Sequence, residues 1–187
     1  MSSHFGGGFG FYQVDGSAPA ARAATETDTP LELRLHGPGA IGTKDPIRLE
    51  VVFANTGTGG LTLIDAMDGS LEHWRDPTYD LYLREETSGT VYRYAFVGGR
   101  CGDINSVGPH DYVDLKPGET RANVQGDWAD YLKSATIAKP GKYTAWVVYR
   151  FCTWQAMGVL LGKDFIRKET HMGMHASNAV ALTVTVH

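Results

Sequence analysis

The residues best suited to chemistry lie in a long segment between the last two expected β-strands. Cys152 opens this segment, and two histidines and two methionines lie near its end: His171, Met172, Met174 and His175. Thiolate, imidazole and thioether groups are ligands that suit copper or zinc. His171 and His175 are four residues apart, a spacing that would place both imidazoles on one face of a helical turn. One hypothesis is therefore a copper- or zinc-binding protein that uses this segment.

A second interpretation of the same segment is a surface loop whose methionines pack against the domain. A blue-copper site needs a cysteine followed within a few residues by a histidine and a methionine, and Cys152 lies too far before His171 for that pattern. The chain has 2 cysteines, Cys101 and Cys152, which can form one disulfide, remain two thiols or contribute to a metal site. The sequence leaves these alternatives open, and otherwise we expect no cofactor.

Another group of reactive side chains lies in the irregular region 98–140. A Cys–His or Asp–His pair there could serve nucleophilic or acid–base chemistry, but aspartates beside glycines are turn residues by default. The group consists of Cys101, Asp103, His110, Asp111, Asp127 and Asp130. The sequence contains neither a phosphate-binding glycine loop nor a nucleophile elbow. We therefore assign no catalytic residue, and the sequence favours a protein that is not an enzyme.

Aromatic residues are the main candidates for binding. Three tryptophans fall in or beside irregular segments: Trp74, Trp128 and Trp154. Two interpretations are open, because these rings can form a platform or anchor for carbohydrate or protein, or they can cover the ends of the domain. The glycine-rich N-terminal stretch carries four more candidates, which we expect to hold it on its own domain or on a neighbouring chain: Phe5, Phe9, Phe11 and Tyr12.

Alternating apolar and polar residues predict the β-strands that must position these groups. The predicted strands cover residues 31–35, 47–53, 61–63, 79–83, 91–97, 112–115, 143–152 and 180–186. Turn residues separate them, and residues 129–135 form either one helical turn or an extended segment. Many short strands with little helix predict an all-β fold, an immunoglobulin-like antiparallel β-sandwich with two long loop insertions and an N-terminal extension.

The longest predicted strand begins after the turn at Pro140 and Gly141. Both of its faces are largely apolar, which is typical of a central strand, and Trp146 is expected in the core. Tyr143 follows the turn at the place of a tyrosine corner, in which the tyrosine hydroxyl caps the backbone of the corner loop. Asn178 precedes the last strand, where many bacterial sandwich domains carry a Ser-Asn pair.

Three motifs carry a resemblance to a known family: VVFANTG at 51–57, LKPGET at 115–120 and KPGKYTAWVVY at 139–149. Their order resembles the immunoglobulin-like domain of the bacterial intracellular proteinase-inhibitor family, and also the accessory domains beside some secreted metallopeptidases. The match covers residues 46–151. The resemblance implies a bacterial sandwich domain and offers a protease-inhibitor-like module as one function, but it assigns no inhibitory residue.

We divide the chain into an extension, residues 1–30, and a β-sandwich domain, residues 31–187. A net charge of -4 gives no electrostatic footprint for nucleic acid, and no segment approaches the ~20 apolar residues that span a membrane. Residues 1–12 lack the pattern of a secretory signal, which predicts a cytoplasmic protein, or a secreted one if a signal has been removed. The first functional hypothesis is a non-catalytic binding or assembly module whose extension and long loops contact a protein partner or form a homo-oligomer.

Overall fold

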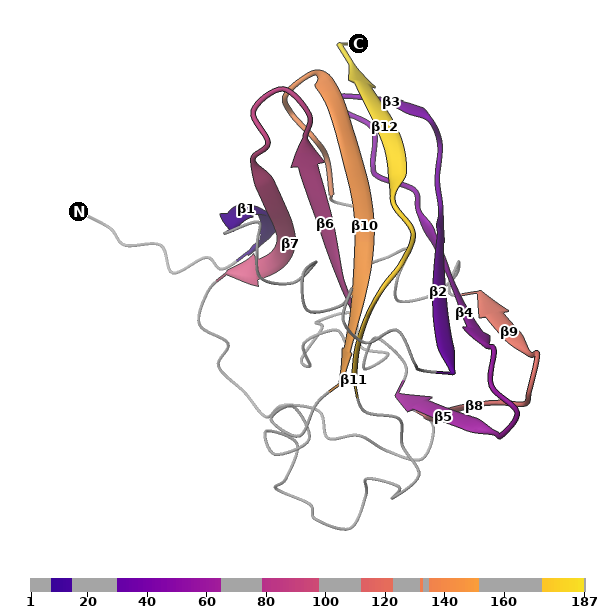
Figure 1. The fold of residues 1–187 in the computed structure, drawn as a ribbon. Coiled ribbons are helices and arrows are strands. Elements are labelled where there is room, and N and C mark those ends of the chain that lie inside the picture. Colours follow the sequence, from indigo (N-terminus) through magenta and orange to yellow (C-terminus); the bar gives the residue numbers. More distant parts are fainter. Residues whose placement is uncertain are drawn as a thin grey trace.

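A computed structural model of the chain shows an all-β fold, as predicted (Figure 1). The structure describes residues 8–14, 30–64, 79–97, 112–122, 132, 135–151 and 173–186. Leu132 has helical conformation. The backbone amide of Ala135 donates a hydrogen bond to the Leu132 carbonyl at 2.8 Å. The other residues of 129–135 lie outside the described part of the chain, so both alternatives for this segment stay open.

The largest sheet has seven strands, in the order β1-β7-β6-β10-β12-β3, with β11 also paired to β10. Its strands are β1 (Gly8–Val14), β3 (Ala40–Gly42), β6 (Tyr79–Glu85), β7 (Val91–Val97), β10 (Gly141–Phe151), β11 (Gly173–Ala176) and β12 (Val180–Thr185). All neighbours are antiparallel except β12 and β3, which run parallel. Strand β6 pairs with one edge of β10, while β11 and β12 share the other edge.

Two smaller sheets complete the fold. Strands β2 (Leu31–His36), β4 (Glu50–Asn55) and β9 (Thr120–Ala122) form one, and β5 (Leu61–Ile64) pairs with β8 (Tyr112–Leu115) to form the other. One hydrophobic core joins residues from all three sheets, including Leu35 of β2, Leu63 of β5 and Val147 of β10. Apolar faces from separate sheets that share a core define a sandwich, which confirms the predicted fold class.

The predicted alternation holds in most strands. In β2, Leu31, Leu33 and Leu35 are buried and the residues between them are exposed. Ile47 and Leu49 are buried as expected, although strand β4 begins only at Glu50. The prediction for Val186 was wrong, because β12 ends at Thr185 and the side chain of Val186 is 72% exposed.

Glycines with positive φ angles occupy two of the turns between neighbouring strands. Gly89 lies between β6 and β7 with a φ of 70°, and Gly118 lies between β8 and β9 with a φ of 76°. Glycine adopts such positive φ angles without the steric penalty that a Cβ atom brings. These two glycines therefore let the chain reverse direction at the ends of neighbouring strands.

Asn55 connects two of the motifs that carried the family resemblance. Its side chain is buried at the end of β4, where the amide nitrogen donates to the carbonyls of Gly59 and Leu115 at 2.8 and 3.0 Å. The Asn55 amide oxygen accepts a hydrogen bond from the Gly57 backbone at 2.9 Å. The backbone carbonyl of Asn55 also accepts from Gly118 at 2.9 Å. The VVFANTG and LKPGET motifs are therefore two sides of one buried junction.

Tyr143 forms the tyrosine corner that the sequence predicts. Its hydroxyl donates a hydrogen bond to the carbonyl of Lys139 at 2.9 Å, and its ring belongs to the main core. The hydroxyl thereby satisfies a carbonyl in the loop that leads into β10, while the ring anchors that loop to the interior. Burial raises the pKa of the Tyr143 hydroxyl, so the hydroxyl stays protonated as a donor.

Ser177 and Asn178 fill a break between β11 and β12. The backbone amide of Ser177 donates to the carbonyl of Val147 at 2.8 Å, and the Ser177 hydroxyl accepts from the Val147 amide at 3.0 Å. The Asn178 side chain bonds the backbone of Leu35 twice, accepting from its amide at 2.7 Å and donating to its carbonyl at 3.1 Å. Because Leu35 belongs to β2, Asn178 ties the large sheet to the opposite sheet.

We expect Tyr143→Phe to lower the free energy of unfolding by about 0.5–1.5 kcal/mol, the usual net contribution of one hydrogen bond. The matched control is Tyr92→Phe on β7, since the Tyr92 hydroxyl makes no hydrogen bond among the described contacts. Urea unfolding of both variants measures the effect. Equal losses in the two variants would show that the corner hydrogen bond contributes nothing.

Asn178→Ala removes two hydrogen bonds between the sheets, and we expect it to lower the free energy of unfolding by about 1–3 kcal/mol. Thr183→Ala is the control, because Thr183 is exposed on the neighbouring strand β12 and only its backbone forms a described hydrogen bond. Urea denaturation compares the pair. The clamp has no energetic role if Asn178→Ala is as stable as Thr183→Ala.

Candidate functional site

Many of the predicted site residues lie outside the described residues, so their hypotheses stay predictions. These residues are Phe5, Trp74, Cys101, Trp128, Cys152, Trp154, His171 and Met172, together with Asp103, His110, Asp111, Asp127 and Asp130. Phe9 belongs to strand β1 and Met174 to strand β11, which fixes their backbone positions. Phe11, Tyr12 and His175 are described with their side chains.

His175 lies in a strand and not in a helical turn. It belongs to β11, where it faces Tyr149 of β10 across the ladder, and the two ring centroids are 6.3 Å apart. The helical spacing expected for His171 and His175 is therefore wrong at His175, because pairing with β10 extends the backbone. Within the described residues, no group of three His, Cys, Asp or Glu side chains could hold a metal ion. Copper or zinc binding remains a prediction.

The N-terminal stretch contributes an edge strand to the large sheet. All seven residues of β1 pair with β7, from Gly8 opposite Val97 to Val14 opposite Val91 (Figure 1). Phe11 packs against the fully buried Tyr94 with 5.1 Å between ring centroids. Part of the extension thus docks on its own domain, which is one of the two placements that the sequence left open.

Tyr12 is an exposed aromatic residue of this edge strand. Its side chain is 37% exposed, and Tyr12 and Val186 are the large hydrophobic residues that lie exposed in the described part of the chain. A Cβ atom at Gly10 would lie 3.4 Å from the Tyr12 hydroxyl, so the Tyr12 ring covers Gly10 along the strand. Glycine at this position leaves room for the ring. Tyr12 therefore presents an aromatic surface at the edge of the sheet.

A second hydrophobic cluster lies on the opposite face of the large sheet from the main core. It consists of Tyr82, Val91, Trp146 and Val148, with Val14 and Ala176 packed against it. Tyr82 and Trp146 stack with 5.6 Å between centroids and an interplanar angle of 12°. Trp146 is buried as predicted, but in this cluster, because its position alternates with Ala145 and Val147 of the main core.

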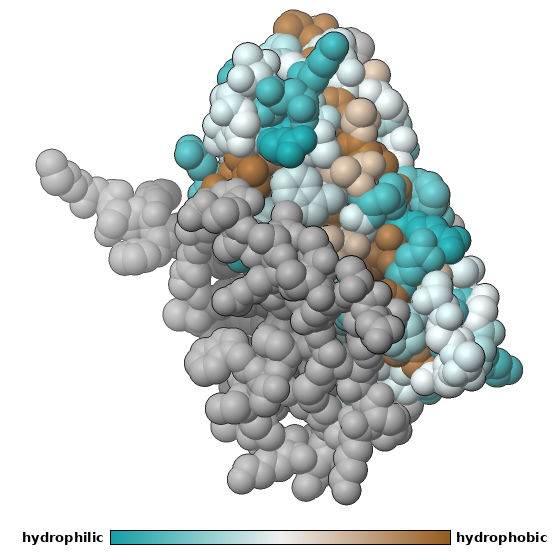
Figure 2. Space-filling view, in the orientation of Figure 1, coloured by the Kyte–Doolittle hydropathy of each residue, from teal (hydrophilic) through white to brown (hydrophobic). Residues whose placement is uncertain are grey.

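This outer cluster is packed too tightly to be a platform for sugar rings. Stacking on a sugar needs an accessible aromatic face, and only 5% of Tyr82 and 9% of Trp146 are exposed. Beside the cluster, Arg93 forms an ion pair at 2.9 Å with Asp80, which is almost completely buried. The described surface in Figure 2 mixes hydrophilic and hydrophobic residues. Tyr12 on the edge strand is thus the better candidate for a contact.

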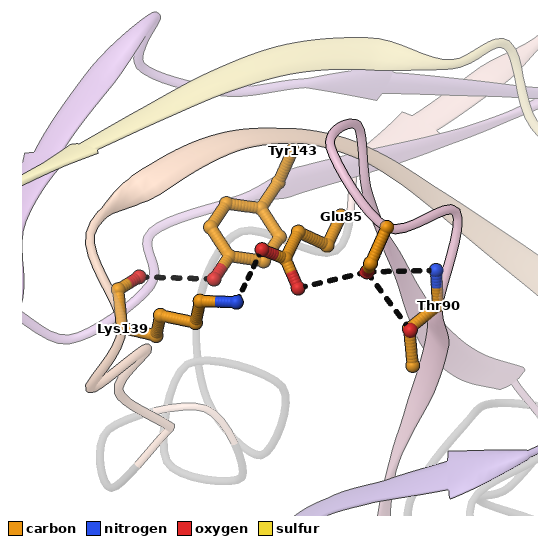
Figure 3. A network of polar contacts seen from close by, with 5 residues as sticks. Glu85, Thr90, Lys139 and Tyr143 are labelled. Atoms are coloured by element: carbon orange, nitrogen blue, oxygen red, sulfur yellow. Dashed lines mark hydrogen bonds and ion pairs between the residues drawn. The ribbon is translucent and has the colours of Figure 1, made fainter.

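A polar network joins the tyrosine corner to the turn between β6 and β7 (Figure 3). The Lys139 ammonium pairs with one carboxylate oxygen of Glu85 at 2.5 Å, and the Ser88 hydroxyl donates to the other at 3.0 Å. The Ser88 and Thr90 hydroxyl oxygens are 2.8 Å apart. The hydrogen bond from Lys139, followed by that from Ser88, lowers the pKa of Glu85, and the same contact with Glu85 raises the pKa of Lys139. The network fastens the β6–β7 hairpin to the start of β10.

The three sheets and their shared core place the chain in the class of immunoglobulin-like β-sandwich domains. No protein-family model matches the sequence, and no curated protein matches it either. The proteinase-inhibitor family is therefore not confirmed, and an inhibitory function remains a prediction. Among the described residues, we find no helix with the length and hydrophobicity needed to span a membrane.

Comparison with solved structures gives weak likenesses. The CARDB domain of a Pyrococcus furiosus protein is 13% identical with a TM-score of 0.36, and the match covers 84% of this chain and 96% of that domain. A β-glucosidase from Listeria innocua is 13% identical with a TM-score of 0.35, covering 84% of this chain and 16% of the enzyme. A β-glucosidase from Erythrobacter marinus is 14% identical with a TM-score of 0.32, covering 82% and 16%. The fold assignment rests on the strands themselves.

Glu85→Gln should destabilise the protein at pH 7 and have little effect at low pH. The pKa of Glu85 is lower in the folded chain than its ordinary value of 4.5, so its stabilisation is present above that pH and is lost as the pH falls through the folded pKa. Thermal unfolding of both proteins from pH 7 down to pH 2 measures this change. We expect their melting temperatures to converge below about pH 4.5.

The control for this pH series is Glu50→Gln. Glu50 lies on β4, and its carboxylate makes no hydrogen bond or ion pair among the described contacts. Glu50→Gln should change the melting temperature only slightly, and by the same amount at pH 7 and at pH 2. A melting difference for Glu85→Gln that does not change with pH would contradict the assigned network.

Proposed function

We propose that the chain is a non-catalytic binding or assembly module that contacts another protein through the β1 edge of its large sheet. The observation that carries this proposal is the position of β1. It ends the strand order, and among the described strands β7 is its neighbour. An edge strand presents a row of backbone amides and carbonyls on its outer side, which another extended chain can pair with.

The side chains of β1 suit such a contact. Tyr12 is exposed, and aromatic rings bury a large area on binding while few bonds become fixed. Native edge strands commonly carry charged residues or proline that discourage pairing with another chain. The seven residues of β1 are GFGFYQV, without a charge or a proline. The composition of this edge therefore permits strand pairing where many edges prevent it.

Tyr12→Lys tests this function. A lysine on an edge strand discourages edge-to-edge pairing, and the loss of a tyrosine at the centre of an interface typically exceeds 1 kcal/mol. We expect the dissociation constant for self-association, or for a protein partner, to rise about tenfold or more. Sedimentation velocity over a concentration series, or titration with the partner, gives this constant.

Val186→Lys is the matched control, since Val186 is the other exposed large hydrophobic residue among those described. It follows the end of β12 and is not part of β1. Its association should equal that of the unmodified chain. If Tyr12→Lys also associates as the unmodified chain does, the β1 edge is not the contact surface and the proposed function is wrong.

A further inference from the structure

We propose that two copies of the chain exchange β1, so that the β1 strand of each pairs with β7 of the other. This inference goes beyond the proposed function, because exchange uses the side of β1 that pairs with β7 and leaves the outer edge of β1 for a partner. Exchange of identical elements is a low-cost way to form a dimer, because the same contacts occur within and between copies.

The β7 edge is built to accept the sequence of β1. Val91 and Tyr94 of β7 are 6% and 1% exposed, and both lie opposite β1 residues in the ladder. Phe11 covers Tyr94 on the core side of the sheet, and Val14 packs on the cluster that contains Val91. An incoming strand must therefore supply an aromatic residue on one face and an aliphatic residue on the other. A β1 strand from a second copy supplies both in the correct register.

The connection of β1 to the rest of the chain permits this exchange. Strand β1 ends at Val14 and strand β2 begins at Leu31, so residues 15–29 and Pro30 join them. An extended chain spans at most ~3.3–3.6 Å per residue, so residues 15–29 can reach on the order of 50 Å. By contrast, β6 and β7 are joined by a tight turn, which includes the hydrogen bond from Gly89 to the Glu85 carbonyl. The length of the connection allows β1, and not β7, to move between copies.

The balance between the two arrangements depends on concentration. Each β1–β7 ladder has the same seven pairs in either arrangement, so the free energy of the contact largely cancels. A tethered strand competes at an effective concentration in the millimolar range for a short flexible linker, and less for a longer one. Exchange therefore becomes measurable as the protein concentration approaches the effective concentration.

Cysteine pairs placed across β1 and β7 distinguish the two arrangements. Gln13 lies opposite Tyr92 in the ladder, and facing residues in antiparallel strands have Cα separations of about 4.5–5.5 Å, which suits a disulfide. Full-length Gln13→Cys is mixed with full-length Tyr92→Cys under mild oxidation. A disulfide between residues 13 and 92 in this mixture can form only between copies. Mass spectrometry of the linked tryptic peptides separates it from any disulfide of Cys101 or Cys152.

We expect the mixture to give the 13–92 disulfide, and its fraction to rise about tenfold for a tenfold increase in concentration while the fraction is small. The negative control replaces Gln13→Cys with Tyr12→Cys, because neighbouring residues of a strand point to opposite faces. The positive control is the chain that carries both Gln13→Cys and Tyr92→Cys, which should close the disulfide within one copy at low protein concentration. Exchange is wrong if this doubly substituted chain links internally and the mixture does not link, and equally wrong if neither links.

The internally linked chain also separates failure of the exchange from failure of the proposed function. Once its β1 is locked on its own β7, exchange is blocked and the protein should sediment as a monomer until the disulfide is reduced. If the locked protein still associates and Tyr12→Lys abolishes that association, partners bind the outer edge of β1 without exchange. The proposed function then stands and the exchange is rejected.

Discussion

The fold depends on strand β10, which is hydrogen-bonded along both edges and buried on both faces. It pairs with β6 on one side and with β11 and β12 on the other. Tyr143, Val147 and Tyr149 face the main core, while Trp146 and Val148 face the outer cluster. With both edges paired and both faces buried, β10 has little freedom to move. Backbone pairing fixes the positions of the neighbouring strands, and apolar burial fixes which side chains face each cluster. The tyrosine corner and the Glu85–Lys139 ion pair fix where this strand begins.

The edges of β2 and β7 are covered in different ways, the first by a side chain and the second by a whole strand. At β2, the Asn178 side chain bonds both the amide and the carbonyl of Leu35 and so occupies backbone groups at this edge. A single side chain cannot be passed between molecules without moving the strand that carries it. At β7, the edge is covered by β1, a whole strand joined to the domain through residues 15–29. Only the second kind of cover can be supplied equally well by another copy.

The elements that could be predicted are those controlled by neighbouring residues in the sequence. The alternation of Leu31, Leu33 and Leu35 predicted the buried face of β2, and the proline-glycine turn before Tyr143 predicted the corner hydrogen bond. The strand conformation of His175 was not predictable from its spacing to His171, because it follows from pairing with β10. The three-way hydrogen bonding of Asn55 was also missed, since its amide reaches Leu115, far away in the sequence. The sequence signal that could have indicated this role is that Asn55 ends a predicted strand and is followed by a glycine-rich turn.

The sequence by itself determined that the chain forms short amphipathic strands with turns between them, and hence an all-β domain. Side chains alternate between faces of a strand as a matter of local geometry, so the pattern of apolar residues is sufficient to reveal them. Tertiary structure alone decided which strands are neighbours, that residues 8–14 complete the sheet beside β7, and that Trp146 belongs to an outer cluster. Strand order is set by contacts between residues that are distant along the chain, and local periodicity carries no information about those contacts.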